Sequence, residues 1–72
     1  MSHLTAKRLK YYREKARMSP AELAALIGVE PTDIIDYETG RVVPDMRIYF
    51  KLSHVLDIST DELLVFEKNA EI

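Results

Sequence analysis

The stretch "SPAELAALIGVEPTDIIDYETG", Ser19 to Gly40, contains the signals that decide the fold. Ser19 and Glu22 have the spacing of a capping box, in which the serine side chain accepts a hydrogen bond from the helix and the glutamate bonds back. Pro20 occupies the first helical position between them, where its missing N–H costs nothing. A helix is therefore predicted to begin at Pro20.

Glycine and proline divide the rest of this stretch. Gly28 is predicted to end the first helix, because glycine readily takes the left-handed conformation that closes a helix. Pro31 begins a second helix almost at once, and Gly40 ends it. Two short helices joined by so tight a connection predict a helix-turn-helix at about residues 20–39.

The same rules predict three further helices around this pair. The first runs from about Leu4 to Arg17 and the fourth from about Met46 to Leu56, while a second capping box at Ser59 and Glu62 opens a short fifth helix through about Phe66. No run alternates apolar and polar residues for long enough to form a strand. We expect an all-α, compact five-helix domain that comprises residues 1–72.

Apolar residues at three- and four-residue spacing identify the faces that these helices should bury. The expected core positions are Leu9, Tyr12 and Ala16 in the first helix, Leu23, Ala24 and Ile27 in the second, Ile34 and Tyr37 in the third, and Met46, Tyr49, Leu52 and Leu56 in the fourth.

Composition excludes several classes of function. The chain has no cysteine, which rules out disulfides, thiolate zinc sites and a cysteine nucleophile. His3 and His54 have no companion at ligand spacing, so no metal site is expected. There is no glycine-rich phosphate loop, and the serines lack the neighbours of an activated nucleophile. We expect neither an enzyme nor a cofactor.

Neither a membrane segment nor a signal peptide is expected. No apolar run approaches the roughly 20 residues that span a bilayer, and the N-terminal "MSHLTAKRLK" leads into further charge. The expected location is the cytoplasm.

Charge is unevenly distributed along the chain, although the net charge is only −2. Residues 1–17 contain six basic residues and one acidic residue, whereas residues 18–40 contain five acidic residues and no basic one. A basic first helix is thus followed by an acidic helix-turn-helix, which is unusual for a partner of nucleic acid.

A family pattern is carried by residues spread over most of the chain: Leu9 and Arg13 in "LKYYRE", Leu23, Ala24, Gly28 and Val29 in "SPAELAALIGV", Ile34, Glu38 and Gly40 in "DIIDYETGR", and Pro44, Leu52, Leu56, Ser59, Asp61, Glu62 and Leu63. With these residues the sequence resembles the Cro/phage-repressor type (XRE-family) of helix-turn-helix transcriptional regulators, with a lambda-repressor-like DNA-binding domain. The resemblance extends over about residues 9–64 without a gap.

The resemblance implies roles for individual residues. Arg13 and Glu38 match positions that form an ion pair between the first and third helices, which would fix the third helix in place. The third helix would enter the major groove of double-stranded DNA, while the start of the second helix and the loop after the third would contact phosphates. The implied DNA-contact candidates are Pro20, Glu30, Pro31, Thr32, Asp33, Asp36, Thr39, Gly40 and Arg41.

The sequence departs from the family pattern at this reading surface. The third helix has no arginine, asparagine or glutamine to read a purine, and its carboxylates repel phosphates. Asp33, Asp36 or Glu30 can accept a hydrogen bond from cytosine, and Thr32 can contact a thymine methyl or form a hydrogen bond to a base through its hydroxyl. Phosphate contacts would then depend on basic residues elsewhere: Arg41, Arg47 and, in the first helix, Lys7, Arg8 and Lys10.

Two hypotheses about function remain open. The first is a small, repressor-like dimeric regulator that binds a specific DNA sequence, with Phe50, Val65 and Phe66 as candidates for the dimer contact. The alternative is a helix-turn-helix fold that binds a protein partner through its acidic third helix, with weak or no DNA binding. Ile35, an apolar residue where the family usually has a small polar one, is expected either in rim packing or on a second partner surface.

Overall fold

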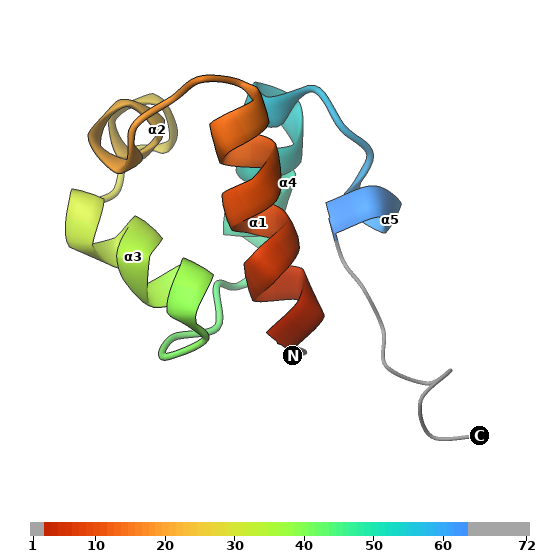
Figure 1. The fold of residues 1–72 in the computed structure, drawn as a ribbon, viewed down its shortest axis with the longest axis horizontal. Helices are drawn as coiled ribbons and strands as arrows, with labels where there is room; N and C mark the ends of the chain where they lie inside the picture. The colour runs from red at the N-terminus through yellow and green to blue at the C-terminus, as the bar shows by residue number, and fades with distance from the viewer. Residues whose placement is uncertain (1–2, 64–72) are drawn as a thin grey trace.

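In a computed structural model, residues 3–63 are described, and they form five α-helices and no strand. The helices are α1 (His3–Lys15), α2 (Pro20–Ile27), α3 (Pro31–Thr39), α4 (Met46–Leu56) and α5 (Thr60–Leu63). Figure 1 shows α2 and α3 as a pair on one side of α1, with α5 on the other side and α4 behind. The predicted fold class is confirmed over this part of the chain.

The boundaries of α2 and α3 form as the sequence predicts. The Ser19 side chain accepts from the backbone N–H of Glu22 at 3.1 Å, and the Glu22 carboxylate accepts from the N–H of Ser19 at 2.8 Å. Gly28 and Gly40 end the two helices at φ values of 79° and 78°, in the left-handed region that glycine adopts without a steric penalty. These caps hold the turn between the helices to three residues, 28–30.

α4 has caps of its own at both ends. The Asp45 carboxylate accepts from the N–H of Ile48 at 2.9 Å, and Asp57 closes the helix in the left-handed conformation at φ 57°. Asp57 is one of the few non-glycine residues with positive φ, where aspartate is better tolerated than most side chains.

All five helices contribute to one apolar core. Its buried members are Leu9, Leu23, Ala24, Ile27, Ile34, Tyr49, Leu52, Leu56 and Leu63. Every buried side-chain nitrogen or oxygen among the described residues has a hydrogen-bond partner, as the cost of burying an unpaired polar group requires.

The core differs from the prediction at two positions. Met46, in the first turn of α4, is 47% exposed. Ala16 is also exposed, since α1 ends at Lys15 rather than continuing to Arg17. Arg13, not Ala16, continues the buried face of α1 beyond Leu9.

The start of α5 is also simpler than predicted. The Ser59 hydroxyl caps the N–H of Glu62 at 3.1 Å, but the Glu62 carboxylate accepts from the hydroxyls of Ser59 and Tyr12 instead of the N–H of Ser59. The predicted continuation of α5 to Phe66 lies outside the described residues. None of the helices in residues 3–63 is long and apolar enough to cross a membrane.

Candidate nucleic-acid interface

α3 is held against the core by two of its side chains. Ile34 is fully buried, and Tyr37, one turn further on, is half-buried against the same core. The short turn at Gly28 fixes the start of α3 relative to α2. The opposite side of α3 is therefore presented outward in one orientation.

A buried ion pair fixes the other end of α3. Arg13 Nε donates to Glu38 Oε2 at 2.6 Å, and Arg13 Nη2 donates to Glu38 Oε1 at 3.1 Å. This bidentate arrangement fixes both the distance between the two side chains and the relative orientation of their planes. The two side chains are only 9% and 5% exposed, and Arg13 Nη1 also donates to the carbonyl of Met18 at 2.8 Å. The hydrogen bond that Arg13 donates to Glu38 raises the pKa of the Arg13 guanidinium, although burial opposes this shift. This pair joins α1 to α3, as the resemblance implies.

Two of the outward carboxylates of α3 also have partners in the structure. The Asp33 carboxylate accepts from the backbone N–H of Glu30 at 2.9 Å, so it caps the helix. Asp36 Oδ1 lies 3.9 Å from Arg41 Nε, and the backbone N–H of Arg41 donates to the Asp36 carbonyl. The acidity of α3 is thus largely explained by local folding, and the side chain of Arg41 remains 78% exposed.

The carboxylates nevertheless make this region electronegative. The pKa of Tyr37 is raised, first by burial and then by the charges of Asp33, Asp45 and Asp36. Carboxylates from α3 and from the cap of α4 therefore act on the same hydroxyl. Exposed apolar residues lie in the following loop and the first turn of α4, namely Val42, Val43 and Met46.

Most of the predicted DNA-contact residues are accessible. Exposed positions are Glu30, Pro31, Thr32, Thr39, Gly40 and Arg41, whereas Pro20, Asp33 and Asp36 are half-buried. Pro20 lies at the start of α2, where it has no backbone N–H to offer a phosphate. Sequence reasoning missed Val42 and Val43, because two valines in "RVVPD" do not reveal whether the loop buries them.

The basic residues of α1 divide between two sides of that helix. Arg8 Nη1 donates to the carbonyl of Glu62 in α5 at 2.9 Å, so this side chain supports the packing of α5. Lys10 is exposed and precedes Arg13 by three residues, which places it on the side of α1 that faces α3. Lys10 is consequently the better placed of the two to add positive charge near α3.

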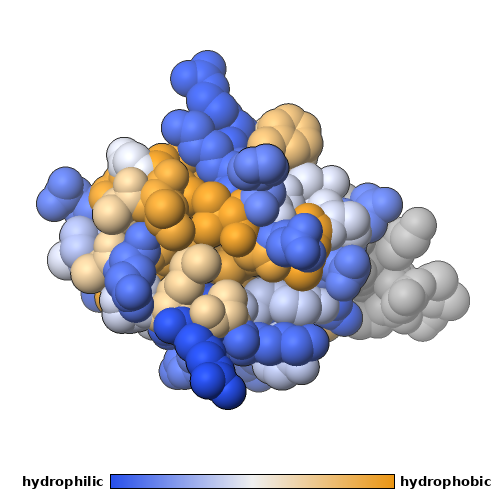
Figure 2. All heavy atoms as spheres, turned by 90° about the horizontal axis from the view of Figure 1, so that it is seen from above, coloured by the Kyte–Doolittle hydropathy of each residue, from blue (hydrophilic) through white to orange (hydrophobic). Residues whose placement is uncertain are grey.

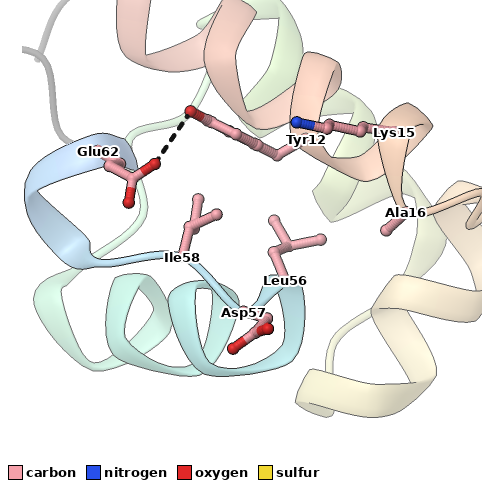
Figure 3. Close-up of a pocket in the computed structure, with 7 residues that line it drawn as sticks. All are labelled: Tyr12, Lys15, Ala16, Leu56, Asp57, Ile58 and Glu62. Carbon is pink, nitrogen blue, oxygen red and sulfur yellow. Dashed lines mark hydrogen bonds between the residues drawn. The ribbon is translucent and has the colours of Figure 1, made fainter.

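Two hollows lie away from the outward side of α3. The first, of about 420 Å³, is an open hollow lined by α1, the end of α4 with the loop after it, and α5. Figure 3 shows the hydrogen bond from the Tyr12 hydroxyl to Glu62 beside it. The second is an apolar groove between α2 and α4, and Figure 2 shows apolar surface gathered over these helices. It is lined by Ala25, Leu26, Ile27, Gly28, Lys51, His54 and Val55.

The candidates for a dimer contact are only partly described. Phe50 in α4 is 57% exposed, so it is free to contact a second chain. Val65 and Phe66 lie outside the described residues. No group of three or more histidine, aspartate or glutamate side chains that could hold a metal ion occurs within residues 3–63.

Comparison with known proteins agrees with this geometry. The helix-turn-helix family pattern matches residues 9–63, which is most of the chain. The chain belongs to the helix-turn-helix family. An "uncharacterized HTH-type transcriptional regulator" of Archaeoglobus fulgidus is 28% identical over 61 residues, 85% of this chain and 86% of that protein.

Two further similarities concern repressors and prophages. A prophage-derived HTH-type transcriptional regulator of Bacillus subtilis, YonR, is 37% identical over 57 residues, 79% of this chain and 53% of that protein. The crystal structure of the P22 c2 repressor in complex with a synthetic operator superposes with a TM-score of 0.79 at 28% identity, covering 83% of this chain and 91% of that one. These relatives are transcriptional regulators and not enzymes, so this helix-turn-helix protein has a DNA-binding domain of the regulator type.

Proposed function

We propose that this helix-turn-helix protein is a cytoplasmic, sequence-specific transcriptional regulator that binds double-stranded DNA through α3 and acts as a small repressor-like dimer. The observation that carries the proposal is the fixed outward side of α3, held by Ile34 and the Arg13–Glu38 pair. The proposal is supported by the similarity to the P22 c2 repressor, whose crystal structure includes a synthetic operator.

In the proposed complex, α3 lies in the major groove and exposed cations approach the phosphates. Arg41 follows α3 directly, and Arg47 lies in the first turn of α4. Lys10 adds charge from the side of α1 nearest α3. Such contacts position the protein and supply most of the affinity, while base contacts from α3 supply the sequence preference.

We further propose that two copies bind a two-fold symmetric site. The two α3 helices would then lie about one duplex turn, roughly 34 Å, apart and read equivalent half-sites. Exposed Phe50 is the described residue that supports a contact between the copies. Occupying a promoter in this way regulates transcription by occlusion or by recruitment.

Duplex binding by charge-matched variants tests the proposal. Arg41→Ala should weaken binding on every duplex and reduce the salt slope by about one, the effect of one lost phosphate contact. Lys51→Ala removes the same charge from the groove between α2 and α4 and should bind like the wild type. Equal effects of the two variants would contradict the assignment of Arg41 to phosphate contact.

The second candidate function is binding of a basic protein surface. The carboxylates of Asp33, Asp36 and Asp45 around Tyr37, next to the exposed Val42, favour it. The double variant Asp33→Asn/Asp36→Asn tests what these two acids do in DNA binding. Higher DNA affinity on every sequence would mean that the acids oppose DNA binding, whereas lower affinity on one sequence alone would mean that they read bases.

A further inference from the structure

The outward stripe of α3 consists of Thr32, Ile35, Asp36 and Thr39. At about 100° per residue these four positions lie within an arc of roughly 100°, opposite the buried Ile34. Ile35 is 46% exposed, Thr32 and Thr39 are exposed, and Asp36 is half-buried. Any ligand of the outward side of α3 meets these four side chains first.

The stripe has little capacity to donate hydrogen bonds. The Thr39 hydroxyl donates to the carbonyls of Ile35 and Asp36 in its own helix, at 2.9 and 3.3 Å, which leaves its methyl group for a partner. α3 contains no lysine, arginine, asparagine or glutamine, the residues that read the acceptors of guanine and the adenine edge. The stripe therefore offers apolar groups, the hydroxyl of Thr32 and the carboxylate of Asp36.

We propose that α3 recognises thymine by apolar contact, with Ile35 packed on the 5-methyl group and the Thr39 methyl beside it. Thymine is the base whose major-groove edge presents a methyl group, so it is the natural partner for an apolar stripe in that groove. The inference rests on the proposed DNA binding and specifies which base the protein prefers. It also gives a use to an exposed isoleucine that packing does not require.

The contact depends on one methyl group, which can be removed without changing base pairing. Uracil lacks the 5-methyl and is otherwise identical to thymine at this edge. Losing one buried methyl corresponds to about 0.8 kcal/mol, or about a fourfold loss of affinity. Ile35→Ser should already lack this contact, so it should not distinguish thymine from uracil.

The experiment begins with selection of preferred duplexes from a random pool by the full chain. Each thymine of a selected duplex is then replaced by uracil, and affinities are measured by fluorescence anisotropy. The affinity of the wild type should fall about fourfold when uracil replaces thymine at one or more positions. The affinity of Ile35→Ser should not change with the same replacement. Leu26→Ser, which removes an apolar residue that is more exposed than Ile35 from α2, should keep the wild-type sensitivity.

The outcomes separate this inference from the function on which it rests. If selected duplexes bind but uracil replaces thymine at every position without effect, thymine recognition is overturned and DNA binding stands. If no duplex binds, the proposed function fails and the inference fails with it. Because the uracil series uses the wild-type protein, it is decisive even if Ile35→Ser does not fold.

Discussion

The buried pair of Arg13 and Glu38 is the individual interaction that most directly orients α3. Its two hydrogen bonds join residues 25 positions apart in the sequence, with both side chains almost fully buried. A buried pair of this kind adds little net stability, because desolvation offsets the attraction, but removing one partner leaves an uncompensated charge. Its main effect is thus to specify one position of α3.

Single and double substitutions of this pair should give non-additive losses of stability. Glu38→Ala should lower the free energy of unfolding by roughly 3–5 kcal/mol, because the Arg13 guanidinium stays buried without its partner. The double variant Arg13→Met/Glu38→Met should lose less than Glu38→Ala alone. Urea denaturation of the wild type, Arg13→Met, Glu38→Met and the double variant completes the cycle, and additive losses would show that the two charges act independently.

At the scale of the element, α3 combines strong boundaries with an unusual surface. Pro31 and Asp33 at its start and Gly40 at its end are residues that favour helix termini in any context. The carboxylate that looks least suitable for a DNA reader, Asp33, is part of the start of the helix. One of the acidic residues of α3 therefore also stabilises the start of that helix.

Replacing Asp33 should show this structural role. Asp33→Ala removes the acceptor for the Glu30 N–H and should lower the free energy of unfolding by about 1 kcal/mol, and the melting temperature by about 4–8 °C. Asp33→Asn keeps an oxygen acceptor and should lose less. Thr32→Ala, at the exposed neighbouring position, is the control for helix propensity and should not destabilise. A loss in Asp33→Asn as large as in Asp33→Ala would point to charge rather than hydrogen bonding.

Local signals predict α2 and α3 well from the sequence, because their caps involve residues three apart. The helix-turn-helix was found at its predicted position, and Gly28 has the positive φ expected of it. Burial was harder to predict where it depends on neighbouring helices. Met46 has core spacing but is exposed in the first turn of α4, and the exposure of Val42 depends on the path of the loop.

In the candidate site, too, local features can be predicted from the sequence, whereas contacts between distant residues cannot. The Arg13–Glu38 pair follows from a resemblance, since residues 25 apart carry no local spacing signal. The structure is needed to see that Asp36 pairs with Arg41. It is also needed to see that the Thr39 hydroxyl donates a hydrogen bond within its own helix. The base preference proposed for α3 therefore rests on the structure as well as on residue types.

At the scale of the whole molecule, two buried or half-buried tyrosines couple stability to alkaline pH. Burial raises the pKa of Tyr49, and burial together with nearby carboxylates raises that of Tyr37. A tyrosine in the unfolded chain titrates near pH 10. The folded state keeps these protons to higher pH, so their contribution is complete below about pH 10 and is lost as pH rises through the folded pKa values.

The free energy of unfolding should accordingly fall as pH rises above about 10. Tyr37→Phe should make this fall shallower, because it removes one of the two linked groups. Urea denaturation between pH 8 and 11 measures the dependence, with Tyr11→Phe, at an exposed position, as the control. An unchanged pH dependence in Tyr37→Phe would contradict a linked role for this residue.

The whole molecule also separates positive from negative charge, with cations on α1 and after α3 and carboxylates on α3 itself. A regulator with this arrangement must neutralise phosphates with the few cations near α3, namely Lys10, Arg41 and Arg47. Its affinity for DNA should then be modest and steeply dependent on salt. A protein-binding module would not show DNA binding that depends on salt in this way.

The salt dependence of binding to random duplex DNA tests DNA binding most directly. The wild-type protein should bind measurably at 50 mM salt, and the logarithm of its binding constant should fall linearly with the logarithm of salt concentration. The expected slope is about −3 per protomer, from roughly three phosphates neutralised. The absence of binding at 50 mM salt, or binding that does not change with salt, would contradict DNA recognition by this helix-turn-helix protein.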